Sequence, residues 1–450
     1  GVMKPRDVVE TGQSDMFRSR LDQIIDMGHE KVVLAQQIDW KFLSEKCGGN
    51  YSDKPGHPAL PIRLMAGLHI LKYADNLSDE EVCLRWVENP YYQYFCGEEF
   101  FSHTLPLDRS SMTRWRQRMG EESIQALLME SLSVAVKVGA AKPADFTQAI
   151  VDTTVQEKNT AFPTDAKLIN RARQKLVKQA KAAGLDLRQS YSRVGKRALI
   201  AHQRYAHAKQ FKRARRQLKK LRTYLGRTIR DISRKIKGNV VLEQAFLRPL
   251  WLAERVMTQR PRDPIPKKVY SLHAPEVECI GKGKAHKPYE FGVKASVATT
   301  LKRSKGGQFA IHAKALPGKP YDGHTLETVI PEIEALTGAT LTRILADAGY
   351  KGHNAPESHK FRVFTAGQKR RVTPAIKRQM RRRSAVEPVI GHLKNGHRMD
   401  RNYLAHEQGD AINPIMAAVG YNFRLILKWI RFLWFQIWIR WITNPSAIFA

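Results

Sequence analysis

The sequence has few cysteines and no cysteine-based site. Its 450 residues contain Cys47, Cys83, Cys96 and Cys279, which form no CxxC pair. This scatter argues against a disulfide scaffold and against zinc held by cysteine, and it fits a reducing compartment. Residues 281–284 lack the spacing of a phosphate-binding P-loop, so no nucleotide cofactor is expected.

Long hydrophobic runs are also missing. The first 15 residues contain no apolar stretch of the kind found in secretory signals. Residues 425–441 are rich in Trp, Ile and Phe, but Lys428, Arg431 and Arg440 interrupt them, and the longest charge-free run has 8 residues. A bilayer-spanning helix needs about 20. We expect a helix that packs on the protein body or on a partner, with a membrane-surface helix as the alternative.

Acidic residues are scarce relative to basic ones. The chain has 76 Lys and Arg against 42 Asp and Glu, which gives a formal charge of +34. A surplus of this size indicates a polyanionic partner, first nucleic acid and second an anionic membrane surface. Hydrophobic residues make up 42% of the chain, enough for packed cores, and the length fits about two to four domains.

The basic surplus is concentrated in residues 167–237. This segment contains 24 Lys and Arg and only two acids, Asp186 and Asp231, so it carries +22 of the total +34. Leu, Ile and Ala recur at helical spacing, which predicts long helices and a helical hairpin. A solvated charged face is one interpretation. A segment of nearly uniform sign repels itself unless a polyanion neutralises it, so we favour DNA contact.

Residues 1–145 are predicted to be mostly helical. Ser78 and Glu81 have the spacing of a capping box, and Ser110 or Ser111 is placed to cap a further helix. That further helix carries Arg114, Arg116 and Arg118. Short helices followed by a basic one are typical of a helix-turn-helix-like DNA-binding unit, although an ordinary helical bundle has the same pattern.

The rest of the chain predicts an α/β layer with a mixed sheet. Strands are expected at 146–155, 286–300, 307–316, 342–347 and 362–365. A helix is expected over 325–336, and another runs from Pro374 through residues 381–394. Strands first and then alternating strands and helices imply one sheet covered by helices.

Two aspartates lie in unusually apolar surroundings. Asp152 follows Ala-Ile-Val, and Asp347 follows Ile-Leu-Ala. A carboxylate at the end of a buried strand needs a cation or hydrogen bonds in compensation. Glu387 is a third candidate because it is surrounded by Lys and Arg. Three such carboxylates would hold two Mg²⁺ ions, which prefer oxygen ligands and clamp both oxygens of a phosphoryl transfer. Taken singly, each acid could equally be a salt-bridged or capping residue.

Several ordered segments resemble bacterial insertion-sequence transposases of the DDE type, in the group of insertion sequence five. These are 151–155 (VDTTV), 162–165 (FPTD), 271–277 (SLHAPEV), 322–326 (DGHTL), 346–350 (ADAGY) and 386–394 (VEPVIGHLK). The resemblance covers most of residues 35–425 and includes the helical region 57–118. It implies an α/β, ribonuclease-H-like mixed-sheet core in which Asp152, Asp347 and Glu387 are catalytic and bind the metal ions.

The resemblance also implies an organisation and a reaction. It predicts a helical N-terminal DNA-binding and dimerisation domain (1–145), a catalytic core split into 146–165 and 266–410, a basic helical insertion (166–265) and a C-terminal amphipathic helix (411–450). The expected reaction is hydrolysis at the ends of the element followed by attack of the 3′-hydroxyl on target DNA. Two Mg²⁺ ions, replaceable by Mn²⁺, a homodimer and the nucleoid of the bacterial cytoplasm are implied.

Basic residues near the third acid have expected supporting roles. In related transposases a tyrosine, arginine, glutamate and lysine signature surrounds this acid. Arg383, Glu387 and Lys394 match its spacing, whereas Met380 occupies the tyrosine position. Arg383 and Lys394 are placed to hold phosphates beside the metals, with plain surface charge as the alternative. Further expected DNA contacts are Arg398, Arg114, Arg116, Arg118, Lys212, Arg213, Arg215, Arg216, Lys219 and Lys220.

Three other residues are weaker candidates, and two other functions compete. Asp322 and His324 lie in a predicted turn, where a structural role in the turn or in a helix cap competes with an accessory catalytic role. His392 is placed either to touch DNA or to pack against the protein. The alternatives to a transposase are a DNA-binding protein with an inactive nuclease-like core and a nuclease without strand transfer.

Overall fold

The computed structural model describes residues 19–51, 59–260, 268–281 and 286–443. The expectations for the first 15 residues and for residues 282–284 therefore lie outside the described residues. The chain divides into two compact units, Gly1–Glu157 with Val293–Ala450, and Lys158–Gly292. Within the described ranges, no helix combines the length and the apolar character that crossing a membrane requires.

The N-terminal part of the first unit is helical, as the sequence predicted. Its capping box is confirmed: the Ser78 hydroxyl accepts from the Glu81 N–H at 3.1 Å, and Glu81 accepts from the Ser78 N–H at 2.7 Å. The helices are α1 (Leu21–Ile24), α2 (Glu30–Gln37), α3 (Trp40–Gly48), α4 (Ile62–Ala74), α5 (Asp79–Glu88), α6 (Pro90–Phe95) and α7 (Ser110–Lys137).

Helix α7 differs from its prediction at its start and has a kink. Neither Ser110 nor Ser111 caps it; Ser110 is its first residue, and the Asp108 carboxylate accepts the Ser110 N–H at 2.8 Å. Gly120 has φ +69°, a left-handed conformation that glycine adopts without steric cost. The kink separates a first half, residues 110–119, from a second half that enters the core.

The mixed sheet of the first unit has the strand order β4-β3-β1-β5-β6, with β7 beside β1. Strands β3 and β4 are antiparallel, whereas β1, β5 and β6 are parallel. Each predicted strand is confirmed within a few residues. The bounds are β1 (Gln148–Lys158), β3 (Tyr289–Thr300), β4 (Ala310–Leu316), β5 (Arg343–Ala346), β6 (Val363–Thr365) and β7 (Arg401–Asn402), and β2 (Glu278–Gly281) pairs with the first residues of β3.

Both faces of the sheet are covered. Alternate residues of β1 and β5 contribute to two separate apolar clusters, because successive side chains of a strand point to opposite faces. One cluster includes α12 (Leu326–Thr337) and α7. The other includes Ile376 of α13 (Pro374–Met380) and Val386 of α14 (Val386–Gly396). The predicted continuous helix from Pro374 is wrong, since it breaks after Met380 and resumes through a 3₁₀ turn, Arg383–Ala385.

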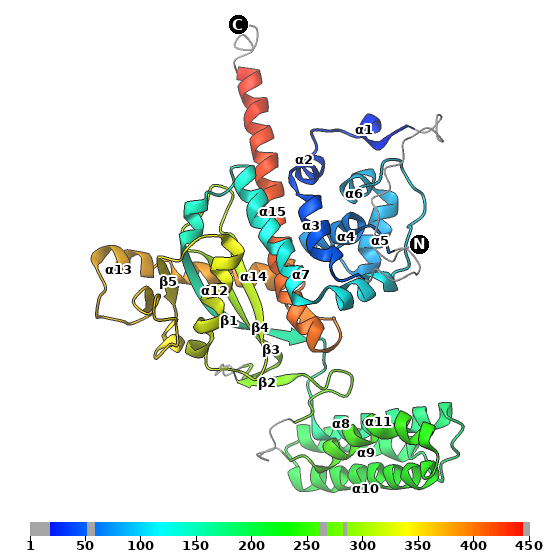
Figure 1. Ribbon diagram of the computed structural model, residues 1–450. Helices are drawn as coiled ribbons and strands as arrows, with labels where there is room; N and C mark the ends of the chain where they lie inside the picture. Colours follow the sequence, from blue (N-terminus) through cyan, green and yellow to red (C-terminus); the bar gives the residue numbers. More distant parts are fainter. Residues whose placement is uncertain (1–18, 52–58, 261–267, 282–285, 444–450) are drawn as a thin grey trace. The chain divides into compact units, whose positions relative to one another are not determined.

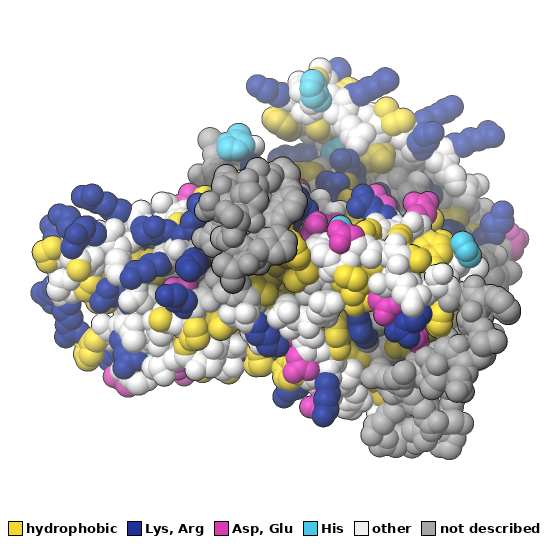
Figure 2. Space-filling view, turned by 90° about the horizontal axis from the view of Figure 1, so that it is seen from above, with side chains coloured by type: hydrophobic (Ala, Val, Ile, Leu, Met, Phe, Trp, Pro, Cys, Tyr) yellow, Lys and Arg dark blue, Asp and Glu magenta, His cyan; other side chains and the backbone are white. Residues whose placement is uncertain are grey.

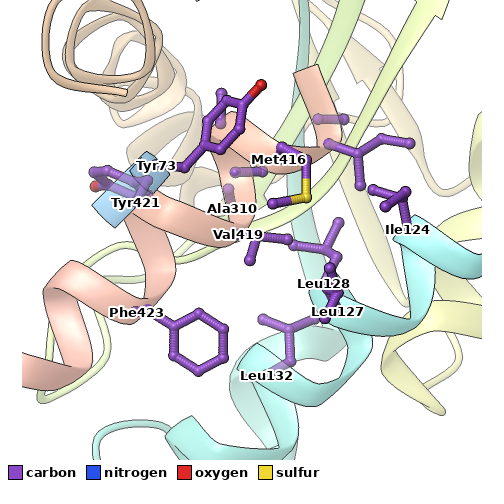
Figure 3. Packing of buried hydrophobic residues seen from close by; sticks show 14 of the residues in the cluster. Tyr73, Ile124, Leu127, Leu128, Leu132, Ala310, Met416, Val419, Tyr421 and Phe423 are labelled. Atoms are coloured by element: carbon purple, nitrogen blue, oxygen red, sulfur yellow. The ribbon is translucent and has the colours of Figure 1, made fainter. Parts of the chain in front are cut away.

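A long helix, α15 (His406–Thr443), begins before the predicted residue 411 and packs on the body of the first unit. It lies beside α7, α4 and β4 (Figure 1). Met416, Val419 and Phe423 pack with Leu127, Leu128 and Leu132 of α7 (Figure 3). Gly420 permits the close approach of α15 to α4, because a Cβ there would overlap the backbone of Tyr73. The packing prediction is thus confirmed as far as Ile430, which is buried.

The second unit contains four described helices that form a bundle of their own (Figure 1). They are α8 (Asp165–Ala182), α9 (Ser192–His207), α10 (Phe211–Ile236) and α11 (Val240–Thr258). An apolar cluster holds them together, with Leu176, Leu225, Ile232 and Phe246 fully buried. The long helices expected in the basic segment are confirmed. Apolar side chains occupy the inside, so most basic side chains are left on the outside; Arg173 of α8 is a buried exception.

Candidate active site

Asp152 and Asp347 lie next to each other where the pairing of the parallel strands β1 and β5 stops. The β1–β5 register ends with Val151 opposite Ala346, and each aspartate is the next residue in the chain: Asp347 directly follows β5, whereas β1 continues through Asp152 to Lys158. Paired parallel strands run side by side in the same direction, so this register brings the two carboxylates together. Both side chains are half-buried.

The alternation of side chains sets the direction of both aspartates. Ile150 and Leu345, each two residues before an aspartate, belong to the cluster that also holds Val386 of α14. Residues two apart in a strand share a face, so Asp152 and Asp347 are directed toward the face on which α14 packs. The residue after Val386 is Glu387, and the sheet therefore brings the third predicted acid to the same side.

A third aspartate, Asp322, joins the pair. Its Oδ1 accepts a hydrogen bond from the Thr153 hydroxyl at 2.8 Å and forms an ion pair with the Lys294 ammonium at 2.5 Å. Gly349 lies between Asp322 and Asp347: a Cβ on this glycine would be 2.9 Å from the Asp347 Oδ1 and 3.2 Å from the Asp322 Oδ2. Asp322 was a weaker sequence candidate, and the structure places it near Asp152 and Asp347.

The electrostatics of this cluster follow from its geometry. Burial raises the pKa of Asp152 to about 6, and the neighbouring charges of Asp347 and Asp322 act in the same direction. The Thr153 N–H, which donates to Asp152 at 2.8 Å, and the Arg383 guanidinium oppose this shift in pKa. Carboxylates held together in this way favour the binding of a cation, because a cation removes their mutual repulsion.

Glu387 is connected to the aspartates through Arg383. The Glu387 side chain is 62% exposed, and its Oε1 lies 3.9 Å from a guanidinium nitrogen of Arg383, whose charge also acts on Asp152. Within the residues that the structure describes, no three His, Cys, Asp or Glu side chains are close enough to form a metal site. The structure therefore brings Asp152 and Asp347 together and leaves Glu387 nearby, facing solvent.

The donor chemistry nevertheless fits a hard divalent ion. Asp152 and Asp347 offer carboxylate oxygens side by side, and such ions bind oxygen ligands through one or two carboxylates. Lys294 is already paired with Asp322, whereas burial keeps the pKa of Asp152 raised although Arg383 lowers it. These two aspartates are thus the residues present that would hold a metal.

The remaining accessory candidates take different positions. Lys394 is half-buried on α14. His392 is exposed, with its ring 6.2 Å from the Tyr421 ring, and His324 is exposed beside Tyr321 at 5.2 Å. Neither histidine is in the aspartate cluster.

Arg116 is a correction to the predicted DNA contacts. It is buried, and its guanidinium binds both carboxylate oxygens of Asp79, at 3.0 and 2.7 Å, and approaches the His69 ring at 3.2 Å. Lys72 contacts the same Asp79 at 2.6 Å. Arg116 therefore has a structural role in place of the predicted contact. Arg114 and Arg118, two residues to either side, are exposed.

Two models of known protein families match parts of the chain. Residues 268–423 match the family described as "Transposase DDE domain", and residues 19–118 match "Transposase domain (DUF772)". The chain belongs to the insertion-sequence transposases with a DDE domain. It is therefore an enzyme of metal-dependent DNA cleavage and transfer, and its mixed α/β sheet fits a ribonuclease-H-like core. Asp347 and Glu387 lie within the matched range, and Asp152 lies between the two ranges.

A relative of known sequence matches a little under half of this transposase. An uncharacterised protein from Rhizobium meliloti, named ORF8 in the nfe locus, is 50% identical over 201 residues, which is 45% of this chain and 97% of that protein. No solved structure matches the chain.

Sequence reasoning missed three residues around the aspartates of the transposase. These are Thr153 and Lys294, which bind Asp322, and Tyr350, which is fully buried beside the cluster. Thr153 and Tyr350 lie inside segments that were singled out for their aspartates. Lys294 gave no signal, because one lysine in a strand is ordinary in a chain this basic.

Proposed function

We propose that the protein is a transposase of the group of insertion sequence five, which binds the terminal inverted repeats of its element and moves that element. The reaction would be Mg²⁺-dependent hydrolysis of a phosphodiester, followed by attack of the freed 3′-hydroxyl on target DNA. The observation that carries this proposal is that Asp152 and Asp347 lie side by side, directly after the last paired residues of β1 and β5. Asp152, Asp347 and Glu387 would be the catalytic set.

The roles of the residues follow from where they lie. Asp152 and Asp347 would hold two Mg²⁺ ions, with Mn²⁺ as a substitute, and Glu387 would complete the ligand set. When bound, such ions activate water and stabilise the charge on the phosphate. Arg383, between Glu387 and Asp152, would bind a phosphate oxygen and position the scissile bond. Lys394 would act two helical turns away on the same face of α14.

The first half of α7 supports the proposed recognition of the element's ends. Its exposed positions recur at helical spacing and form one polar face, whereas Met112, Trp115 and Met119 are buried on the other. The exposed face consists of Ser110, Thr113, Arg114, Gln117 and Arg118. Hydroxyl, amide and guanidinium side chains of this kind contact base edges and phosphates in protein–DNA complexes.

A cavity of about 480 Å³ adjoins this α7 face. Thr113 and Gln117 line it from α7, and Arg398 and Arg401 line it from the segment after α14. The Arg398 guanidinium lies 5.7 Å from the ring of Tyr403, which is 61% exposed. Arg398 therefore supports a DNA path that joins the α7 face to the end of the active-site helix.

The second unit would provide sequence-independent affinity. The six basic residues proposed on α10 are all exposed: Lys212, Arg213, Arg215, Arg216, Lys219 and Lys220. Lys and Arg side chains are also prominent on the face of the molecule seen in Figure 2. Contacts of this kind release counterions from DNA and make binding strongly dependent on salt. A homodimer acting on two DNA ends, in the nucleoid of the bacterial cytoplasm, completes the proposal.

Cleavage of DNA that carries the element's ends tests this function. In Mg²⁺ the wild-type protein should nick this DNA and form joined products. Asp347→Asn keeps an oxygen that can accept the Gly349 N–H but removes the charge, so it should bind the DNA normally and cleave at least about 100-fold more slowly. The matched control is Glu357→Gln, whose side chain is 84% exposed and pairs with Lys360.

The outcomes separate the competing functions. Equal cleavage by wild type and Asp347→Asn would show that the site is wrong. Cleavage without joined products would identify a nuclease without strand transfer. Binding without cleavage by the wild type would identify a DNA-binding protein with an inactive core.

A further inference from the structure

A strongly basic segment runs from the end of β6 to the start of α14, outside the DNA contacts proposed above. Residues 366–386 contain eight Lys and Arg and no Asp or Glu. Arg383 is half-buried beside Glu387, whereas the other seven are exposed. We call these seven the α13 surface: Lys369, Arg370, Arg371, Lys377, Arg378, Arg381 and Arg382. Among the residues that the structure describes, no carboxylate forms an ion pair with any of them.

This segment begins and ends beside the candidate active site. The Ala366 N–H, directly after β6, donates to the oxygen of Ala346, the last residue of β5, at 3.1 Å. Asp347 follows Ala346, so the segment leaves the sheet beside this aspartate. At its other end it reaches Arg383, which lies 3.9 Å from the Glu387 carboxylate. The α13 surface is therefore connected to Asp347 through β6 and to Glu387 through α14.

Packing fixes α13 on the sheet. Ile376 is buried in the cluster that contains Leu345 of β5 and Phe364 of β6. The Gln379 side chain accepts a hydrogen bond from the Arg343 guanidinium. One face of α13 is thus attached to the protein, and the basic side chains occupy the face that is open to solvent.

The spacing of these charges is unfavourable without an anionic partner. Lys377 and Arg381 are four residues apart, as are Arg378 and Arg382. Helix α13 ends at Met380, and both following arginines keep helical backbone angles. Like charges at this spacing on a helix repel each other and destabilise it. Duplex DNA bound through its phosphates would neutralise them, and phosphate contacts carry no sequence preference.

The α13 surface and the proposed path of the element's end lie on different sides of the aspartate pair. The cavity beside the α7 face is lined by Arg401 of β7, which pairs with β1. Asp152 is on β1, Asp347 follows β5, and α13 packs on β5 and β6. Figure 1 shows α13 on the β5 side of β1 and α7 on the other side. Strand transfer needs two DNA segments at the same carboxylates, and these surfaces approach them from two directions.

We propose that the α13 surface holds the target DNA through its phosphates during strand transfer, while the α7 face and Arg398 hold the element's end. This inference rests on the proposed function, because it needs a strand-transfer reaction at Asp152 and Asp347. It gives the two DNA substrates separate surfaces within the first unit. The partner of the α13 surface is duplex DNA of any sequence, since every duplex presents the same phosphates.

Neutralising the α13 surface in the full-length protein tests the proposal. The variant combines Lys377→Gln, Arg378→Gln, Arg381→Gln and Arg382→Gln. Two reactions would be measured in Mg²⁺: cleavage of DNA that carries the element's ends, and joining of a precut end with a free 3′-hydroxyl to a plasmid. We expect wild-type cleavage and a loss of about 10-fold or more in joined products. This loss should shrink as salt rises, because salt weakens the phosphate contacts of the wild type.

The matched control removes four exposed charges from α3 and from the connector between β3 and β4. It combines Lys41→Gln, Lys46→Gln, Lys302→Gln and Lys305→Gln. This control should cleave and join as the wild type does. The melting temperature of both variants checks their folding. That of the α13 variant should be unchanged or higher, because repulsion between like charges is removed.

Crosslinking tests the same surface without removing the whole set of charges. A photoactivatable p-benzoylphenylalanine in place of Arg378 should crosslink to labelled target DNA in a complex that contains both DNA substrates. The same group in place of Arg114 should crosslink to the labelled end. This measurement decides the proposal even if the fourfold variant does not fold.

Three results would overturn the proposal. The first is a folded α13 variant that joins ends as well as the wild type. The second is an equal loss of cleavage and joining, which would assign the α13 surface to the element's end. The third is crosslinking from position 378 to the end and not to the target. Failure of the proposed function is distinguishable, because then the wild-type protein itself forms no joined products from a precut end.

Discussion

Asp152 and Asp347 are the first residues beyond the paired part of β1 and β5, directly after Val151 and Ala346, which lie opposite each other. Nearly 200 residues separate them in the sequence, including the whole of the second unit. Parallel pairing alone brings them side by side. The position of the candidate active site therefore depends on the register of two strands. Its chemistry depends on which positive charges and hydrogen bonds compensate the two neighbouring carboxylates.

The first prediction concerns stability and pH without metal. The pKa of Asp152 is raised to about 6 in the folded protein, against about 3.9 for an unfolded chain. The folded state therefore binds more protons than the unfolded state between these values, and Asp152 loses its stabilising contribution as pH rises through about 6.

Asp152→Asn should remove this loss. The unfolding free energy of the variant relative to wild type should rise by roughly 2–3 kcal/mol between pH 4 and pH 7, measured by urea denaturation in the presence of a chelator. A pH-independent difference between the two proteins would contradict the pKa assigned to Asp152. Addition of Mn²⁺ at pH 7 should restore the unfolding free energy of the wild type and leave that of the variant unchanged.

The second prediction concerns Gly349. A Cβ at this position would be 2.9 Å from the Asp347 Oδ1 and 3.2 Å from the Asp322 Oδ2, so Gly349→Ala must displace a carboxylate. We expect a loss of about 10- to 100-fold in Mn²⁺ affinity and cleavage rate. Gly391→Ala is the control: this glycine of α14 has nothing within 4 Å of the added Cβ. That change should leave activity intact and raise stability by up to about 1 kcal/mol.

The third prediction separates Arg114 from Arg116. Arg116→Ala leaves the Asp79 carboxylate without its bidentate partner and should reduce the unfolding free energy by about 3–5 kcal/mol. Arg114→Ala should change stability by less than about 0.5 kcal/mol and weaken binding to the element's ends. Denaturation and DNA-binding titrations on both variants check this. Similar behaviour of the two arginines would contradict the buried position of Arg116.

The fourth prediction concerns the basic face of α10. Replacing Lys212, Arg216 and Lys219 with Gln should weaken binding to DNA of any sequence. The slope of log affinity against log salt should become shallower by about 0.9 for each phosphate contact that is lost. Preference for the element's ends over random DNA should persist, since it is assigned to α7. A loss of that preference in the α10 variant would contradict this division.

Much of the candidate site could be predicted because strands carry a strong local signal. An acid at the end of an apolar, β-branched run is unusual, and two such runs drew attention to Asp152 and Asp347. The partners of these acids could not be predicted. Lys294 and Asp322 meet only when β3 and the turn after β4 are placed by the fold, and the sequence contains no local trace of that contact.

Helical predictions failed where tertiary packing decided the outcome. The basic helix of α7 was predicted, but which of its arginines face inward depends on Asp79 of a different helix. The break after Met380 was missed because residues 374–394 lack an internal glycine or proline at that point. Ile376 and Val386, on either side of the break, are both buried in the cluster on one face of the sheet.

The most direct test of the account is the location of Mn²⁺, by anomalous scattering, in crystals of the full-length protein bound to DNA that carries the element's ends. The account predicts a peak about 2.0–2.2 Å from carboxylate oxygens of both Asp152 and Asp347. A peak elsewhere, or none at these two side chains in an assembled complex, would contradict it.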